Sequence, residues 1–461
     1  MYTKHESLGR RLANPHFWIA FGFFVAILLG TGLLCLPVAS ASGKALPPLV
    51  ALFMATSATC VTGLSIVDVS TELSITGQVI VLVLIQLGGI GIMTFGTFLL
   101  VLVGRRLSLQ NEFVLIDAYG INKVQGLHAL IGWIIGFTFL FEGIGAAVLY
   151  WRYRALGMAQ GVPWTRTFYH SVFHAVSAFC NSGVTLYPDS LQQFKHDPLY
   201  LLTIGALVVT GGLGFLVLYN LVTIRFWRRD LRTRGRLSLH TKIVLTMTLI
   251  LLLGGTVLIL AEEWSGTLSG LAWHDKLACS FFHSVSPRTA GFVALPVEHL
   301  SEGTRYVTTL LMLAGGSPGS TAGGMKTTTI LVLVLTVVAM CKRRREIVVF
   351  ARTIPYTIVQ QAISIAFICV TMVLVAYGLL LWTEHVQDPS DASRLLFEVV
   401  CAITTVGMSP HTPQLTIAGK WIVVVCMYLG RLGPLTVALV VSRDDEVFPS
   451  ISYPKEEVVV G

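Results

Sequence analysis

The chain has 461 residues, of which 54% are hydrophobic and only 12% are charged. This composition excludes an ordinary soluble domain and indicates a membrane protein with several long apolar segments. The formal net charge of +8 does not indicate nucleic-acid binding, because most basic residues are concentrated in short segments between the apolar runs. By the positive-inside rule these segments, which include both termini, are predicted to be cytoplasmic. They are residues 1–12, 104–126, 225–242, 342–355 and 443–461.

In chain order, four long apolar runs leave the predicted cytoplasmic segments. They are residues 16–38, 127–150, 242–261 and 355–382. Each is long enough to span a bilayer, which takes about 20 residues. The first run is too long for the apolar region of a signal peptide, about 7–15 residues, so we interpret it as a membrane helix as well. Four further runs lead back toward the cytoplasm: residues 77–103, 198–224, 306–341 and 418–442.

A short apolar run lies between each outgoing helix and the returning helix that follows it. The short runs are residues 47–60, 167–180, 272–286 and 392–404. As helices they would extend roughly 20 Å, which is too little to cross a hydrocarbon core about 30 Å thick. Such a segment dips into the membrane and turns back, and its backbone must be enclosed by protein or water. We therefore predict four re-entrant helices.

A glycine follows each short run, and a phenylalanine stands ten residues before each glycine. The glycines are Gly63, Gly183, Gly291 and Gly407, and the phenylalanines are Phe53, Phe173, Phe281 and Phe397. The last loop contains the Thr-Val-Gly of potassium-channel filters, in which backbone carbonyls replace the hydration shell of the ion. Four such loops in one chain can surround a single axis, so the pattern predicts a cation pore. The predicted filter residues are Val61, Thr62, Gly63, Asn181, Ser182, Gly183, Thr289, Ala290, Gly291, Thr405, Val406 and Gly407.

Polar side chains near these loops are candidates for contacts with ions. The hydroxyl groups of Thr59, Thr62, Ser182, Thr289, Thr404 and Thr405 are suited either to capping backbone amides or to coordinating an ion. Asp68 and Asp189 follow two of the loops and are predicted to attract cations to the outer mouth. Glu142 is a further acidic candidate near the pore. Glu398 is compatible with attracting cations, or with stabilising the positive end of a helix dipole.

Two arginines depart from the positive-inside pattern. Arg152 and Arg154 lie at the predicted outer end of a membrane helix. Their neighbours suggest an anchor at the outer interface: Glu142, Tyr150, Trp151 and Tyr153. Five of the eight cysteines lie in apolar segments and are interpreted as small packing residues. They are Cys35, Cys60, Cys180, Cys369 and Cys426.

The returning helices share a small-residue motif at corresponding places. The motifs are residues 87–91, 210–214, 314–318 and 429–433. Small residues here allow close approach of helices or leave space around an axis. In the third returning helix the motif continues into a Gly- and Pro-rich segment, residues 314–324, which interrupts helical hydrogen bonding. We interpret it as a mobile gate below the filter, the alternative being a passive kink. The predicted gate residues are Gly315, Gly316, Ser317, Pro318, Gly319, Ser320, Thr321, Ala322, Gly323, Gly324 and Arg431.

Arg431 replaces a small residue of the fourth motif, within an apolar helix. A charge at that depth is costly and is expected to face the interior of the bundle. It is interpreted as a cation below the filter that repels permeant ions, or as a residue that neutralises a helix end or pairs with a carboxylate. Lys326, just past the gate, is expected to extend its amine toward the cytoplasmic interface.

The predicted fold is therefore an all-α integral membrane protein with eight transmembrane helices. It comprises four pseudo-repeats of helix, re-entrant pore loop and helix around one central pore. The expected repeats are residues 1–104, 105–225, 226–345 (with the gating loop 314–324) and 346–461.

Together the four loops, the gate segment through Thr329 and Arg431 resemble the Trk/Ktr/HKT superfamily of cation transporters, and its KtrB branch in particular. TrkH relatives typically carry two additional helices ahead of the first repeat, whereas Gly63 leaves space for only one. Several sodium-conducting HKT members have serine at the first filter glycine, so Gly63 favours potassium. The resemblance implies potassium uptake across the bacterial inner (plasma) membrane, with both termini cytoplasmic. Dependence on sodium, as a symporter, is left open.

The resemblance also implies a homodimer with one pore per subunit, in contact with lipid and docked on a cytoplasmic ring of nucleotide-binding KtrA-like subunits. Nucleotide is expected only on that partner, because this chain lacks a Gly-x-Gly-x-x-Gly fingerprint, and no other cofactor is expected here. A secondary transporter with inverted repeats is disfavoured because all four repeats begin in the cytoplasm. An enzyme is disfavoured because His170 and His174 have no evident metal-binding partner, and His283 lies at a comparable place in the third repeat.

Overall fold

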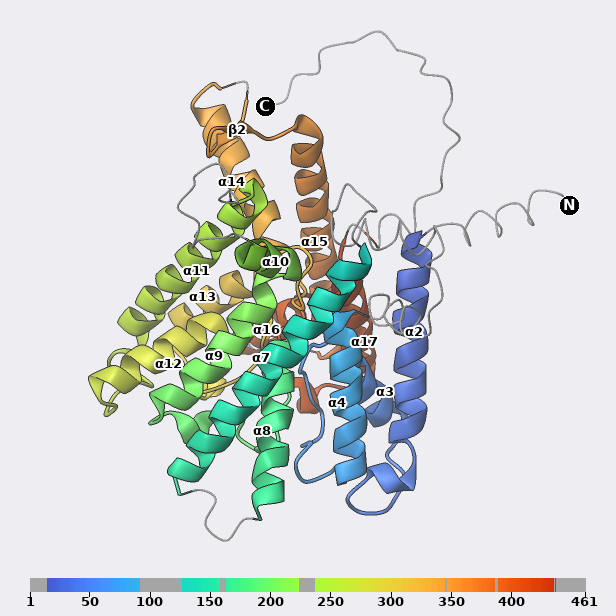
Figure 1. The fold of residues 1–461 in the computed structure, drawn as a ribbon. Coiled ribbons are helices and arrows are strands. Elements are labelled where there is room, and N and C mark those ends of the chain that lie inside the picture. The colour runs from blue at the N-terminus through green and yellow to red at the C-terminus, as the bar shows by residue number, and fades with distance from the viewer. Residues whose placement is uncertain are drawn as a thin grey trace, which may run out of the picture.

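The computed structural model describes residues 15–91, 127–157, 163–223, 237–344, 346–385, 389–434 and 436. Their regular structure is almost entirely helical (Figure 1). The exception is a short antiparallel hairpin of β1 (Val348–Val349) and β2 (Arg352–Thr353), in which Val348 pairs with Thr353. Most of the predicted cytoplasmic segments and the last parts of the returning runs 77–103 and 418–442 lie outside the described residues.

Four long apolar helices correspond to the predicted outgoing runs. They are α2 (Pro15–Leu34), α7 (Leu127–Ala155), α11 (Leu239–Glu263) and α15 (Tyr356–Thr383). Within the described part of the chain, these are the single helices long and apolar enough to cross a membrane. Their outer faces are apolar and exposed, as Phe367 (73% exposed) and Trp382 (76% exposed) on α15 illustrate. Such faces suit contact with lipid hydrocarbon.

The four predicted short helices are confirmed. They are α3 (Pro48–Thr59), α8 (Trp164–Phe179), α12 (Trp273–Val285) and α16 (Pro389–Ile403). Proline marks the start of three of them, where its fixed φ suits the first helical turn and its missing N–H costs nothing. Pro47 and Pro163 are the N-cap residues of α3 and α8, and α16 begins at Pro389.

The returning runs begin as predicted but are interrupted. The helices are α4 (Ile75–Ile90), α9 (Pro198–Leu213), α10 (Phe215–Thr223), α13 (Glu302–Leu313), α14 (Thr327–Cys341) and α17 (Ile417–Leu432). A side-chain oxygen caps the first turn of α4, α9, α13 and α17 alike. The capping residues are Ser74, Asp197, Ser301 and Thr416. Short 3₁₀ helices lie in the loops: η1 (Pro37–Ala39), η2 (Gln192–Phe194), η3 (Val297–His299) and η4 (Thr412–Gln414).

The expectation of one continuous helix over 198–224 is wrong. The axes of α9 and α10 differ by 93°, and the break falls at Gly214, whose φ is +90°. The last glycine of two other motifs also has positive φ, +90° at Gly91 and +83° at Gly433. Glycine adopts this conformation without steric cost, so these motifs end α4, α9 and α17 as well as permitting close packing. Over 306–341, α13 and α14 flank the predicted non-helical segment.

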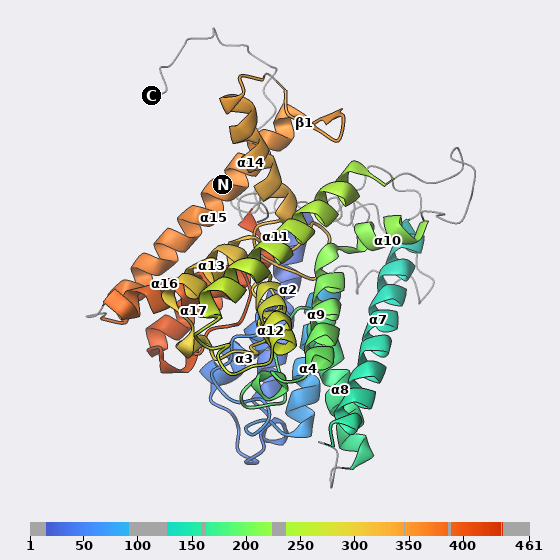
Figure 2. The ribbon, with the colours of Figure 1, turned by 90° about the vertical axis from the view of Figure 1, so that its left-hand side faces the viewer.

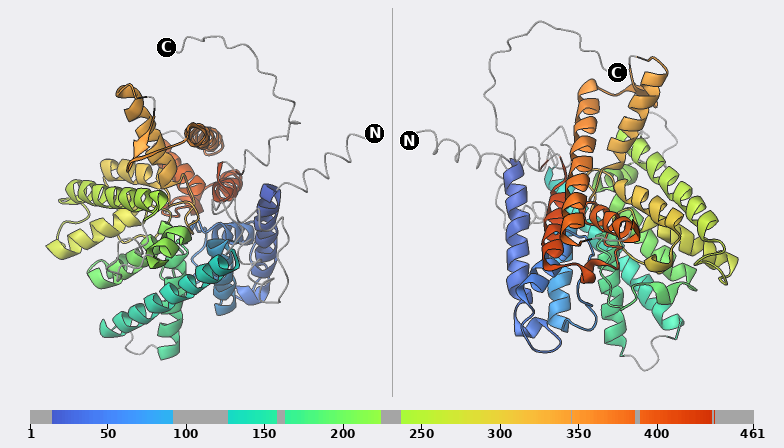
Figure 3. Two further views of the ribbon diagram at one scale, coloured as in Figure 1. Left: turned by 45° about the horizontal axis from the view of Figure 1, so that its top comes forward. Right: turned by 180° about the vertical axis from the view of Figure 1, so that it is seen from behind.

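The helices pack in a cyclic order that is visible in Figures 2 and 3. Each returning helix contacts the short helix of the next group: α4 packs on α8, α9 on α12, and α13 on α16. The last helix, α17, then packs on α3, the first short helix. The phenolic oxygen of Tyr428 on α17 also donates to the Ala20 carbonyl on α2 (2.8 Å). Elements from the two ends of the described chain therefore meet, and the glycine loops lie where the short helices converge.

Candidate functional site at the four glycine loops

Each short helix ends in a loop with the same backbone conformation. We call residues 61–63, 181–183, 289–291 and 405–407 the four glycine loops. The first and third residue of each loop have positive φ, as in Thr405 (+54°) and Gly407 (+84°). The other pairs are Val61 and Gly63, Asn181 and Gly183, and Thr289 and Gly291. Residues with side chains rarely adopt positive φ. Its recurrence at the same position of all four loops therefore indicates a shared requirement on the directions of the carbonyl groups.

The glycine of each loop faces the next loop in a closed cycle. A Cβ atom on Gly63 would overlap the carbonyl oxygen of Ser182, and one on Gly183 would overlap that of Ala290. In the same way, Gly291 faces the Val406 oxygen and Gly407 faces the Thr62 oxygen. The carbonyl involved always belongs to the residue immediately before the next glycine. The structure thus brings all twelve predicted filter residues together in one cluster of loops.

An open vestibule of about 470 Å³ lies over the four loops. Its lining includes all four glycines and three acidic residues, Asp68, Asp189 and Glu298. No basic residue is among the described residues of this lining. The predicted positions of Asp68 and Asp189 near the mouth of the loops are confirmed, whereas Glu298 was not singled out from the sequence. A vestibule lined by one sign of charge concentrates the opposite ions.

On the other side of the loops lie buried hydroxyl groups. The side-chain oxygens of Thr59, Thr62, Ser182 and Thr405 are fully buried and have no hydrogen-bond partner within the described part of the chain. Thr404 instead donates to the Val400 carbonyl (2.6 Å). No backbone amide among the described residues is capped by these five hydroxyls, so the capping role considered from the sequence is not seen for them.

Residues 314–324 form a loop, which we call the crossing loop, directly against the glycine loops. A Cβ atom on Gly323 would overlap the hydroxyl of Thr405, and the Thr321 hydroxyl donates to the Phe179 carbonyl at the end of α8 (3.2 Å). The Ser317 amide donates to the Gly212 carbonyl in the last turn of α9 (3.0 Å). The predicted gate residues 315–324 therefore lie between the glycine loops and the bend after α9.

Arg431 links the crossing loop to another helix end. Its guanidinium donates to the Thr321 carbonyl (2.6 Å) and to the Gly88 carbonyl in the last turn of α4. No carboxylate among the described residues forms an ion pair with it, so pairing with a carboxylate is not seen, whereas the bond to the Gly88 carbonyl fits the other alternative, neutralisation of a helix end. Lys326 was expected to extend to the interface, and this is wrong: its amine turns back and donates to the Ala322 carbonyl (2.8 Å). Two cations therefore hold the crossing loop by its carbonyl oxygens.

Arg288, next to the third glycine loop, was given no role in the sequence analysis. It is only 7% exposed, and its Nε atom has no hydrogen-bond partner among the described residues. With Gly212, Thr248 and Gly316 it lines a cavity of about 10 Å³, roughly the space of one water molecule. The signal that identified Arg431, a charge within an apolar membrane segment, applies similarly to Arg288 at the end of the third re-entrant run and could have found it.

Other charged residues lie elsewhere than the sequence suggested. Glu142 is buried and accepts from the Gln86 amide (3.3 Å), so it is not part of an outer-interface anchor. Glu398 lies beyond the first turn of α16 and accepts from the Thr412 hydroxyl (2.7 Å), which ties the loop that contains η4 to that helix. Arg152, which departed from the positive-inside pattern, forms an ion pair with Asp197, the N-cap of α9 (2.9 Å).

The ring of His174 on α8 has structural partners, whereas the Nδ1 atom of His170 has no hydrogen-bond partner within the described part of the chain. The Nδ1 atom of His174 is bonded to the His170 carbonyl (2.7 Å), and its Nε2 atom accepts from the Leu186 amide (3.2 Å). Both ring nitrogens are therefore occupied. Among the described residues, no group of three or more His, Cys, Asp or Glu side chains is placed to hold a metal ion.

Apolar spanning helices around a cluster of carbonyl-bearing loops define a membrane transport protein for ions. The chain belongs to the TrkH family of cation transport proteins, whose family model matches residues 3–448. It is similar to the Ktr system potassium uptake protein B of Bacillus subtilis, with 36% identity over 446 residues, which cover 96% of each chain. It is also similar to the potassium/sodium uptake protein NtpJ of Enterococcus hirae, with 34% identity over 457 residues and 98% of each chain.

A solved structure shares the fold. The crystal structure of the potassium transporter TrkH from Vibrio parahaemolyticus superposes with a TM-score of 0.69 and 18% sequence identity. The superposition covers 92% of this chain and 85% of that one. The resemblance to the Trk/Ktr/HKT superfamily and its KtrB branch that the sequence indicated is thus confirmed.

Proposed function

We propose that the chain is the ion-translocating subunit of a bacterial potassium uptake system, and that the four glycine loops form its selectivity filter. The observation that carries this proposal is the cycle in which each glycine faces the carbonyl before the next glycine. Oxygens arranged around one axis can replace the hydration shell of a monovalent cation. The loops then belong to four repeats of helix, re-entrant helix and returning helix, with the domain boundaries given above.

We propose further that the vestibule faces the outside of the cell and that the crossing loop is a gate. The basic residues after α14, Lys342–Arg344, lie at the end of that helix away from the glycine loops (Figure 1), and the positive-inside rule places such residues in the cytoplasm. An ion leaving the filter inward would meet the crossing loop and Arg431. Moving that loop exchanges a few carbonyl contacts and leaves the helices in place.

Regulation is proposed to come from a separate subunit. The family resemblance implies a homodimer on a ring of KtrA-like nucleotide-binding subunits at the cytoplasmic face. The names of the relatives support an associated component, because they are described as proteins B and D of a Ktr system. The enzyme alternative is set aside in favour of transport. Sodium dependence is proposed as a property to test, since the Enterococcus relative is named a potassium/sodium uptake protein.

The proposal is tested by ion flux into proteoliposomes that contain the purified full-length protein. We expect uptake of the tracer rubidium-86, and we expect added potassium to inhibit this uptake far more strongly than added sodium does. The reason is that the carbonyl ring favours the larger, more easily dehydrated ion. Uptake is measured with and without sodium, and with and without the cytoplasmic partner. Equal inhibition by sodium and potassium would contradict a potassium filter, and the absence of flux in every arm would contradict ion translocation by this subunit.

The acidic vestibule gives a separate prediction about apparent affinity. Replacing both Asp68 and Asp189 with asparagine is expected to raise the potassium concentration for half-maximal uptake about two- to fivefold at low ionic strength, because the vestibule then attracts fewer cations. The effect should shrink at high ionic strength, where the Debye length is short. The control is Asp391→Asn on α16, a half-exposed carboxylate that pairs with Arg394 and does not line the vestibule. An unchanged half-saturation at low salt would exclude the electrostatic role.

A further inference from the structure

The four short helices carry different side chains at one equivalent position, and among the described residues only two of these side chains, Ser177 and Cys401, bond to the glycine loop that follows or to the residue next to it, whereas the Ser57 hydroxyl has no partner. Six residues before the four glycines stand Ser57, Ser177, Val285 and Cys401. Before the second glycine loop, the Ser177 hydroxyl on α8 donates to the Val184 carbonyl, just past Gly183 (2.7 Å). Before the third glycine loop, Ser286, next to Val285, makes the corresponding bond: its hydroxyl donates to the Phe292 carbonyl (2.5 Å). Both hydroxyls hold a carbonyl oxygen beyond the ring.

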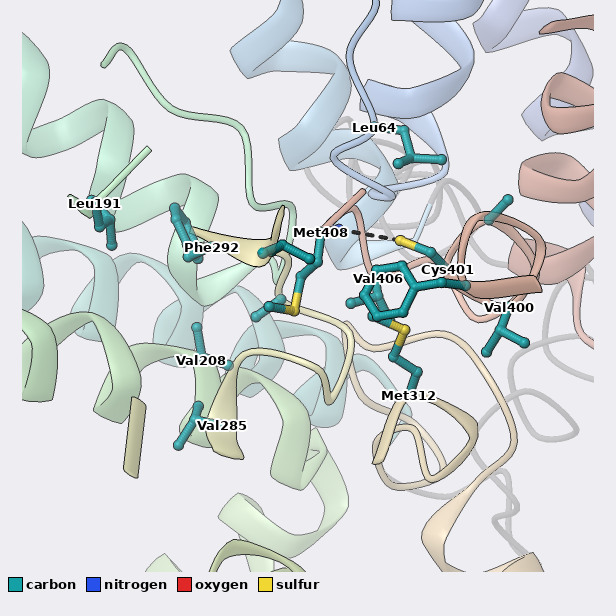
Figure 4. Close-up of a cluster of buried hydrophobic side chains, with 14 of the residues drawn as sticks. Leu64, Leu191, Val208, Val285, Phe292, Met312, Val400, Cys401, Val406 and Met408 are labelled. Carbon is teal, nitrogen blue, oxygen red and sulfur yellow. Dashed lines mark hydrogen bonds between the residues drawn. The ribbon is translucent and has the colours of Figure 1, made fainter. Parts of the chain in front are cut away.

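Cys401, on α16 before the fourth glycine loop, accepts hydrogen bonds instead of donating one. Its sulfur accepts from the backbone amides of Gly407 (3.0 Å) and Met408 (3.2 Å). Figure 4 shows the thiol beside Met408 and Val406 within a cluster of apolar side chains, and Cys401 is 0% exposed. The sequence analysis assigned Cys401 no role, because nothing in its local sequence distinguishes a packing thiol from a hydrogen-bond acceptor.

The two contacts determine where two carbonyl oxygens of the fourth loop point. A peptide group is planar and trans, so its N–H and C=O point in opposite directions. The amide that donates to Cys401 from Gly407 shares a peptide group with the Val406 carbonyl. Turning that N–H outward to the sulfur therefore turns the Val406 oxygen inward, toward Gly291, where the structure places it. The Met408 amide fixes the direction of the Gly407 carbonyl in the same way.

We propose that Cys401 is a positioning residue for ion selectivity, which orients the Val406 and Gly407 carbonyls of the fourth loop from behind. This inference rests on the proposed function of the loops as a filter. A filter discriminates between ions through the number and direction of its carbonyl dipoles. Without an acceptor at position 401, the two peptide groups can rotate and the preference for potassium weakens.

The test compares Cys401→Ala, Cys401→Val and Cys401→Ser in the full-length protein, using the proteoliposome assay of potassium uptake inhibited by sodium or potassium. Alanine and valine supply no acceptor, and valine stands at the equivalent position of the third loop. We expect both to lower the potassium-over-sodium preference by roughly tenfold, the effect of losing about one net hydrogen bond. Serine, which retains an acceptor, is expected to preserve more of the preference than either.

Two controls separate this inference from the proposed function. Cys426→Ala removes another buried thiol, on α17, whose neighbours face a groove beside α15 and not the glycine loops, and it should leave the preference unchanged. Gly407→Ser is measured in parallel. If Gly407→Ser loses the preference while folded Cys401→Ala or Cys401→Val keeps it, the role of Cys401 is wrong and the filter stands. If Gly407→Ser and the corresponding variants at Gly63, Gly183 and Gly291 all keep the preference, the filter itself is wrong.

Discussion

Replacing Gly407 with serine is expected to remove most of the preference for potassium over sodium. The residue has φ of +84°, and a Cβ atom there would overlap the Thr62 carbonyl oxygen across the ring. Relief of that overlap must displace a coordinating oxygen, and the φ itself is unfavourable for serine. We expect a loss of roughly tenfold or more in selectivity, since 1.4 kcal/mol corresponds to a factor of ten. The measurement is competition of sodium and potassium for rubidium-86 uptake.

The same substitution at Gly63, Gly183 and Gly291 is expected to act in the same direction, because each glycine faces a carbonyl of the next loop. The matched control is Gly378→Ser on α15, where an added Cβ atom meets nothing within 4 Å. If all four loop variants assemble normally and discriminate between the ions as the wild type does, the loops do not form the filter. Thermal stability in detergent distinguishes a folded variant from a collapsed one.

Replacing Arg431 with alanine is expected to raise the maximal potassium flux several-fold. The change removes a positive charge from the inner side of the filter, where at an effective dielectric of about 20 a charge acts on an ion over several ångströms with energies above thermal energy. It also removes the two donors that join the Thr321 and Gly88 carbonyls, so the crossing loop loses its tie to α4. Initial uptake per assembled transporter is measured with and without the cytoplasmic partner.

Removing a buried charge can also destabilise the bundle, so two further variants accompany the test. Arg431→Lys keeps the charge and should remain nearer to the wild type in flux. Deletion of residues 317–320 shortens the crossing loop while leaving Arg431 in place, and it should raise flux and reduce the dependence on the partner. The control is Lys420→Ala, which removes a basic residue from the opposite end of the same helix, α17. Unchanged or lower flux in a stable loop deletion would leave residues 314–324 as a break in packing, without a gating role.

The sequence predicted most of the helix boundaries because their causes are local. A short apolar run followed by glycine has few structural solutions in a membrane, and proline marks the starts of α3 and α16 in the sequence itself. The glycine loops were found for the same reason, since glycine adopts positive φ without steric cost and recurs at the third position of each loop. The interruption of the third returning helix at residues 314–324 follows from the density of glycine and proline, which excludes a continuous helix there.

The parts that could not be predicted depend on contacts between distant segments. Gly214 looks like any packing glycine of a membrane helix until its carbonyl neighbours in the crossing loop are known. Glu142 was placed at an interface because its sequence neighbours are aromatic, whereas its partner Gln86 comes from another helix. Cys401 is a similar case. Whether a buried thiol packs or accepts hydrogen bonds depends on the backbone that turns in front of it.

The contact of α17 with α3 has a consequence for how the protein is made. Among the described residues, α17 packs on α3 and so closes the cycle of helix packing, and α17 also supplies Arg431 and the Tyr428 bond to Ala20 on α2. A nascent chain that has inserted its first three groups of helices is open on one side, and two of its three glycine loops, the first and the third, lack a neighbour. The carbonyl groups of Thr321 and Gly88 then lack the hydrogen bonds from Arg431, in a medium that offers no replacement. Completion of the pore must therefore follow translation of the fourth group, whatever order the earlier helices insert in.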